Sequence, residues 1–308
     1  MRYLQFLLLA ALLAGCSAPT ATPSGGAAGA VTPVLAVSEL TVGSNRLALG
    51  LIRGGSPIND PKATVQLRFY DLSDTSATPQ QEQRATYYGQ HLPAAVYVAY
   101  PSFAKPGEWA VDVVTQLAGE APQTAKLRLD VLERSQVPNV GERAIAVKTL
   151  TAADVADLTR LSSVRPKDDS LYRISLDAAL ASGRPTVLLF ATPAFCRTAV
   201  CGPSLDVLAA LQKQYGAKAN FIHVEVYRYP FSDSFAKQQQ VFDTLTRENR
   251  APTAEERAAG LSDPMAAWGL LSEPWMYLID GSGVIAARYE GGITEEELGP
   301  AVGKLVGG

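Results

Sequence analysis

Two cysteines, five residues apart, stand between a run typical of a buried strand and a run typical of a helix. Cys196 and Cys201 follow the apolar segment 186–190, and helical spacing of apolar residues begins at Leu205. A thiol at such a junction lies near the positive end of the helix dipole, which favours the reactive thiolate. The only other cysteine, Cys16, ends an N-terminal apolar segment. The pattern therefore predicts thiol–disulfide exchange at Cys196 and Cys201.

The first 16 residues have the features of a targeting signal. Arg2 precedes an apolar run over 3–13, which is shorter than the roughly 20 residues that span a bilayer. That length suits the core of a secretory signal peptide. The end of the run, Leu13-Ala14-Gly15-Cys16, resembles a bacterial lipoprotein signal. The resemblance implies cleavage before Cys16 and a lipid on that residue, and an ordinary signal peptide is the alternative.

Residues 17–33 are mostly Ala, Pro, Thr, Ser and Gly. Such a segment has too little large apolar surface to form a core, and we expect a flexible tether. The mature protein would then be lipid-anchored on the extracytoplasmic face of a bacterial membrane. That compartment permits disulfides.

The composition excludes several classes of function. The net charge is −3 and no basic block is present, so a nucleic-acid partner is not expected. Two histidines and three methionines argue against a His-rich or Met-rich metal site. We expect neither a metal nor a cofactor.

Residues 34–134 carry a strand pattern throughout. Apolar residues alternate in five segments: 47–52, 64–70, 95–100, 109–114 and 125–132. Short strands of this kind, separated by turn residues, predict an all-β sandwich of the immunoglobulin-like kind. Their order and the turn over 103–109 resemble the extracytoplasmic domains described as YtkA-like. We expect a spacer or docking module, with His91 as a surface residue.

Residues 135–169 are predicted to link this domain to a second one. Pro138 and Gly141 interrupt regular structure. A short helix is expected within 148–165, capped by Thr151 with Asp154 three residues later.

Residues 170–308 have the strand and helix order of an α/β domain. Helices are expected over 205–215 and 234–249, and strands over 220–226, 275–279 and 284–289. A last helix is expected after a capping box of Thr294 and Glu297. The excursion over 227–263 could cover the site, bind a partner or pack on the sheet.

Three motifs in this domain resemble the thioredoxin fold, in particular TlpA-type and ResA-type membrane-tethered oxidoreductases. They are the cysteine segment, Ser272-Glu273-Pro274-Trp275 before a strand, and the ending Leu-Ile-Asp-Gly-Ser-Gly at 278–283. The resemblance implies a cis peptide bond before Pro274 facing the attacking cysteine. It also implies a substrate groove. Five residues are assigned to that groove: Thr192, Pro193, Phe195, Pro274 and Trp275.

The cysteine spacing departs from the C-x-x-C of the family. In a regular helix, residues five apart are about 7.5 Å apart along the axis, whereas a disulfide needs Cα atoms closer than roughly 7 Å. We therefore expect Cys196 in a loop and Cys201 just ahead of the helix, with Pro203 at the first helical position. Cys196 is favoured as the attacking thiol and Cys201 as the resolving thiol. In a competing alignment, Cys201-Gly202-Pro203-Ser204 matches Cys-Gly-Pro-Cys, with serine in place of the second cysteine.

The leading hypothesis is an extracytoplasmic thiol–disulfide oxidoreductase. Its partners would be a protein or small-molecule disulfide and a membrane-bound electron donor. The first alternative is a non-catalytic thioredoxin-like module with a structural disulfide. The second is a peroxiredoxin-like peroxidase, suggested by Thr192-Pro193, although 273–279 lacks the arginine that the family needs.

The third alternative is a Sco-like copper assembly factor. That family uses a histidine shortly before the Leu-Ile-Asp strand, and none is present over 272–275. His223 is instead expected to be a packed or hydrogen-bonded core residue.

Overall fold

The computed structural model describes residues 29–76 and 78–307. The predicted signal peptide, Cys16 and most of the predicted tether lie outside the described residues. Within those two ranges, no helix combines the length and the apolar character that a bilayer crossing requires.

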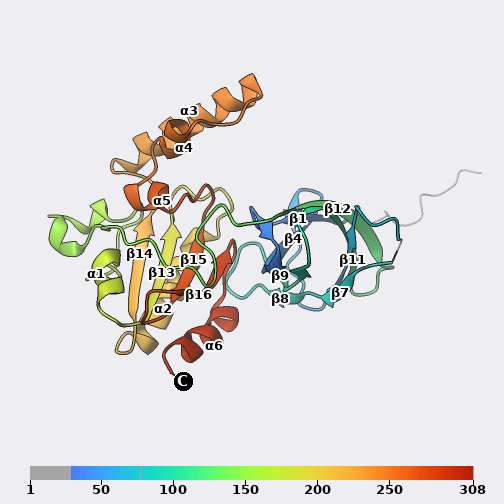
Figure 1. Cartoon of the computed structure of the whole chain (residues 1–308), viewed down its shortest axis with the longest axis horizontal. Helices are drawn as coiled ribbons and strands as arrows, with labels where there is room; N and C mark the ends of the chain where they lie inside the picture. Colours follow the sequence, from blue (N-terminus) through green and yellow to red (C-terminus); the bar gives the residue numbers. More distant parts are fainter. Residues whose placement is uncertain (1–28, 77, 308) are drawn as a thin grey trace, which may run out of the picture.

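The N-terminal part of the described chain folds into two facing β-sheets, which we call the sandwich (Figure 1). One sheet has the order β1 (Thr32–Leu35), β4 (Leu47–Arg53), β9 (Val96–Ala99) and β8 (Thr86–Tyr88), with β5 (Ser56–Pro57) on β4. The other has the order β2 (Leu40–Thr41), β12 (Gln123–Leu132), β11 (Gly107–Gln116), β6 (Thr64–Asp71) and β7 (Gln81–Arg84). A small two-stranded sheet joins β3 (Gly43–Ser44) to β10 (Ser102–Phe103).

Alternation explains why these segments form a sandwich. In β4 the side chains of Leu47, Leu49 and Leu51 are buried, and every second residue of β6 from Val65 to Phe69 is buried against them. Successive side chains of a strand point to opposite faces, so each strand contributes one apolar face to a shared core. All five predicted strand segments are confirmed as strands. Kinship with immunoglobulin-like or YtkA-like domains stays a prediction.

The segment after β12 contains two short 3-10 turns rather than one helix over 148–165. They are η1 (Ala152–Asp154) and η2 (Leu158–Arg160). The predicted pairing of Thr151 with Asp154 is present. The helix does not continue because Asp157 caps a new turn, accepting a hydrogen bond from the Thr159 N–H at 3.0 Å.

The C-terminal part is a four-stranded sheet with helices on both faces. The sheet order is β14 (Asn220–Glu225), β13 (Thr186–Ala191), β15 (Trp275–Ile279) and β16 (Ile285–Glu290). β13 and β14 are parallel, whereas β15 is antiparallel to both of its neighbours. The mixed sheet agrees with the α/β domain that was expected over 170–308.

Two cores cover the two faces of this sheet. One includes side chains of α2 (Cys201–Tyr215) and α6 (Glu295–Leu305). The other includes side chains of α1 (Leu176–Ala181) and α5 (Asp263–Ala267). The remaining helices, α3 (Phe231–Glu248) and α4 (Ala254–Ala258), project together from the body, and we call them the arm (Figure 1).

Two helix starts and one helix cap differ from the prediction, and the first of these is α3, which begins at Phe231 rather than 234. α2 begins at Cys201 rather than 205, so Pro203 is its third residue and not its first. Proline is tolerated there because the N–H groups of the first turn have no partner within the helix. Thr294 caps α6 by accepting from the Glu297 N–H at 3.3 Å, but the Glu297 carboxylate does not return to close the predicted box. It pairs instead with Arg46 of the sandwich, at 2.6 Å.

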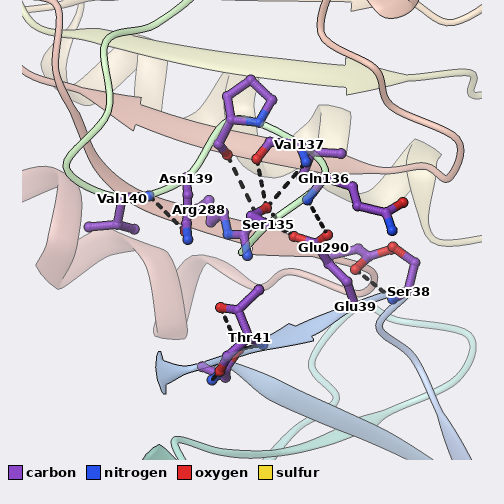
Figure 2. Close-up of polar contacts among 12 residues, drawn as sticks. Ser38, Glu39, Thr41, Ser135, Gln136, Val137, Asn139, Val140, Arg288 and Glu290 are labelled. Atoms are coloured by element: carbon purple, nitrogen blue, oxygen red, sulfur yellow. Dashed lines mark hydrogen bonds and ion pairs between the residues drawn. The ribbon is translucent and has the colours of Figure 1, made fainter. Parts of the chain in front are cut away.

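Polar contacts hold the sandwich against the second domain. Arg46 donates to both oxygens of Glu297 and to the backbone carbonyls of Glu290 and Gly292, at 2.6–2.8 Å. Nearby, Arg288 of β16 pairs with Glu39 at 2.8 Å, and the Ser38 N–H donates to the Glu290 carboxylate at 2.7 Å (Figure 2). Both ion pairs are almost fully buried.

Candidate functional site

The cysteine loop, residues 192–200, connects β13 to α2. Cys196 lies in this loop, as expected, whereas Cys201 is the first residue of α2 rather than just ahead of it. The loop turns back on itself at Ala199, whose φ of 57° lies in the left-handed region. This turn brings the Cys201 N–H to 3.3 Å from Cys196 Sγ. Both thiols are free.

The pKa values of the two thiols are shifted in opposite directions. The pKa of Cys196 is lowered to about 5, mainly because the Cys201 thiol donates a hydrogen bond to it. Burial opposes this shift, and Thr198 and the N–H groups of Cys201 and Val200 add to it. The pKa of Cys201 is raised because its proton is held in that bond and because the side chain is fully buried. At neutral pH the pair is a partly exposed Cys196 thiolate beside a protonated Cys201.

The segment before β15 lies next to this pair. The Glu273–Pro274 peptide bond is cis, as the resemblance implies. Pro274 is buried, and its carbonyl accepts a hydrogen bond from the Gly291 N–H at 3.0 Å. Burial raises the pKa of the Glu273 carboxyl to about 7, with smaller contributions from the charges of Cys196 and Glu225.

The other residues assigned to the substrate groove lie in different surroundings. Thr192 is fully buried and Pro193 is half-buried. Phe195 is half-buried and stacks on Phe235 of α3, with ring centroids 5.0 Å apart. Their role in a groove stays a prediction.

Trp275 is only 2% exposed. Its indole N–H donates to Ser272 Oγ at 2.8 Å, its ring stacks on Tyr277, and Arg288 lies over the ring. As the first residue of the inner strand β15, Trp275 lies in the core beside the domain interface, and its role in a substrate groove stays a prediction.

The sandwich packs directly against the cysteine loop, which the sequence analysis did not anticipate. Leu92, Val96 and Val98 of the sandwich form one buried cluster with Val200, and Cys196 packs against that cluster. The sequence feature that could have predicted this contact is the apolar run of β9. A strand that is apolar at every position is expected to be buried on both faces, and β9 is buried on both. The sandwich is thus one flank of the site.

Two buried titratable residues lie at the end of β14. His223 is a hydrogen-bonded core residue, as predicted: its Nε2–H donates to the Ala191 carbonyl at 3.1 Å and its Nδ1 accepts from Tyr172. Burial lowers the pKa of His223 to about 4. The sequence analysis did not single out Glu225. Its carboxylate accepts a hydrogen bond from the Ser163 N–H at 2.7 Å. Burial raises the pKa of this carboxyl group. A glutamate inside the apolar run 220–226 was the available signal.

Across residues 29–76 and 78–307, no group of three or more His, Cys, Asp or Glu side chains is placed to hold a metal ion. His91 is exposed, as expected.

Comparisons with known proteins give only distant likenesses. No family model matches the chain, and no curated protein matches it. One similar solved structure is that of a thiol:disulfide interchange protein described as DsbE, from Chlorobium tepidum. It is 16% identical, with a TM-score of 0.35, over 55% of this chain and 99% of that one.

A second thioredoxin-family interchange protein, from Chlorobium tepidum TLS, is 14% identical, with a TM-score of 0.30, over 56% of this chain and 99% of that one. A thioredoxin-like superfamily protein is 13% identical, with a TM-score of 0.32, over 53% of this chain and 96% of that one. The resemblance of the chain to the thioredoxin fold rests on its own motifs, among them the cis peptide bond before Pro274.

Proposed function

We propose that this protein is an extracytoplasmic thiol–disulfide oxidoreductase in which Cys196 attacks and Cys201 resolves. The observation that carries the proposal is the contrast between the two sulfurs. Cys196 is partly exposed and has a lowered pKa, whereas Cys201 is buried and holds its proton. Only the thiolate form of a cysteine is nucleophilic, so the accessible Cys196 thiolate makes the first attack. The buried Cys201 thiol reacts only in the second displacement.

The exchange proceeds in two displacements. The Cys196 thiolate attacks one sulfur of a substrate disulfide, a mixed disulfide forms, and the other substrate sulfur leaves as a thiolate and is protonated. Cys201 then loses its proton and attacks Cys196 Sγ, so the Cys196–Cys201 disulfide forms and the second substrate thiol departs. The substrate gains two electrons and the cysteine pair loses two. A thiol-bearing, membrane-bound donor would reverse these steps on the pair and restore it.

The loop geometry supports the second displacement. The Cys201 N–H donates to Cys196 Sγ, which keeps the start of α2 against the sulfur to be attacked. Cys16 and the segment around it lie outside the described residues, and the proposal of a lipid anchor on the extracytoplasmic face rests on the lipoprotein-like signal alone.

Trapping tests the roles of the two thiols. A Cys201→Ser variant mixed with a disulfide-bearing peptide should accumulate a mixed disulfide, seen as an added mass that dithiothreitol removes. A Cys196→Ser variant is the matched control and should accumulate none. Accumulation in Cys196→Ser alone would reverse the roles, in favour of the alignment that starts at Cys201.

The reduction potential separates an exchange enzyme from a structural staple. Exchange enzymes lie between about −270 and −120 mV, whereas structural disulfides lie below about −300 mV. We expect the reduction potential of the Cys196–Cys201 pair to lie between about −270 and −120 mV. A value below about −300 mV would contradict the proposal and favour the non-catalytic module.

A further inference from the structure

A groove runs beneath the arm. Its lining combines one face of α3 with the α3–α4 connection and with Leu271, and its volume is about 610 Å³. Phe242 of α3 and Leu271 of the body are 56% and 55% exposed. Among the described residues of α3, none is buried. The arm thus presents apolar side chains that its own packing does not use.

The apolar face of α3 follows helical spacing. Phe235, Gln238, Phe242 and Leu245 lie three, four and three residues apart, which places them on one side of the helix. A surface helix normally buries such a stripe against the body. Here only the first turns reach the body, where Phe235 stacks on Phe195, while Phe242 and Leu245 line the groove.

Two residues connect the groove to the neighbourhood of the cysteine site. Leu271 is three residues ahead of the cis-proline Pro274. Phe235, on the same face of α3, contacts Phe195, the residue next to Cys196. The groove thus lies beside segments that border the cysteine site, so one polypeptide could contact both.

We propose that this groove binds an apolar segment of the polypeptide whose disulfide is exchanged at Cys196. The inference rests on the proposed function, because it names the substrate class of the same site. The preferred substrates are then polypeptides with an apolar stretch beside the disulfide, and small disulfides are poor substrates.

The test uses the full chain and three disulfides. They are glutathione disulfide, a peptide with one intrachain disulfide flanked by Leu and Phe, and the same peptide with Ser at the flanks. Wild type should favour the Leu/Phe peptide over the Ser peptide by at least about tenfold in kcat/KM. Phe242→Asp and Leu271→Asp should remove that preference and change the rate with glutathione disulfide by less than about twofold.

Leu72→Asp is the matched control, because Leu72 is also an exposed apolar residue, at 44%, and lies in the sandwich. It should change none of the three rates. Light scattering on each variant reports the mass of the particle in solution. Equal rates with both peptides in wild type would overturn the proposal, as would a dimer that Phe242→Asp converts to monomers, since a second copy would then cover the groove.

The two proposals fail in different ways. If wild type exchanges glutathione disulfide and both peptides at equal rates and Cys196→Ser exchanges none, the oxidoreductase proposal stands and the groove proposal falls. If wild type exchanges no disulfide at all, both proposals fall.

Discussion

The two flanks of the cysteine loop are built in opposite ways. On one side the sandwich packs a buried apolar cluster against Cys196 and Val200, and the ion pair of Arg46 with Glu297 has both side chains 5% exposed or less. On the other side the arm contacts Phe195 only through its first turns and leaves Phe242 in solvent.

This difference separates two tasks. A buried, ion-paired interface is a fixed one, because opening it would leave charges without partners in an apolar setting. An exposed helix with few contacts can move or accept a partner at low cost. On the proposed function, the sandwich flank positions Cys196 Sγ for attack, and the arm flank is free to meet a substrate.

Breaking the ion pair on the sandwich flank should have the largest effect. Arg46→Met leaves the Glu297 carboxylate buried without its partner, which costs about 3–5 kcal/mol in the free energy of unfolding. Denaturation by urea measures the loss. Arg128→Met is the control, since its pair with Glu108 is about 70% exposed on both sides and should contribute at most about 1 kcal/mol. Equal losses in the two variants would show that the interface is not fixed by Arg46.

A charge added on the sandwich flank should shift the titration of the thiol. Alkylation of wild-type Cys196 by iodoacetamide should be half-maximal near pH 5, the pKa to which its hydrogen bonds lower it. Val37 packs against the same cluster as Cys196, so the carboxylate of Val37→Asp should raise that midpoint by on the order of one unit. Val37→Asn is the neutral control and should leave it in place. An unchanged midpoint in Val37→Asp would mean that a charge on the sandwich does not affect the pKa of Cys196.

The same pKa sets the sign of a pH effect on stability. Cys196 has a lower pKa in the folded chain than the roughly 8.5 of an unfolded cysteine, so its contribution is complete above about pH 8.5 and is lost as the pH falls to about 5. Cys201 has a raised pKa, and its contribution is present below about pH 8.5 and declines at higher pH. The reduced protein should thus gain stability from Cys196 between about pH 5 and 8.5. A Cys196→Ser variant should lose this slope.

A change on the arm flank should cost less. Phe235→Leu keeps an apolar side chain but removes the aromatic pairs with Phe195 and with Tyr227, each worth about 0.5–1.5 kcal/mol. Urea denaturation should show a loss of about 1–3 kcal/mol, below that of Arg46→Met. A loss as large as that of Arg46→Met would mean that the arm is as firmly docked as the sandwich.

The smallest effect is expected near the base of the arm. Arg228 pairs with Asp263 at 2.8 Å, but the two side chains are 52% and 81% exposed. Arg228→Ala should change the free energy of unfolding by less than about 1 kcal/mol, because exposed ion pairs are screened by solvent. Differential scanning calorimetry in low and high salt measures it. A larger loss would mean that this pair orders the arm.

Local patterns were sufficient for most strands and for the place of Cys196. The alternating segment 64–70 became β6, and the apolar run 186–190 became β13. Local rules failed where two signals competed. Asp157 capped a second turn within 148–165, and the Glu297 side chain left the predicted capping box for Arg46, which is distant in sequence.

The amino-acid sequence alone determined the two sheet-forming halves and the loop that separates the cysteines, because strand periodicity and helix geometry act over a few residues. Only the tertiary structure decided that the sandwich lies against Cys196, that Trp275 is buried, and that Glu225 is a buried carboxyl group beneath the site. Those outcomes depend on contacts between segments more than a hundred residues apart, or on burial by other elements. Local patterns indicated at most that β9 is covered on both faces and that Glu225 lies in an apolar run, and they did not name the covering segments.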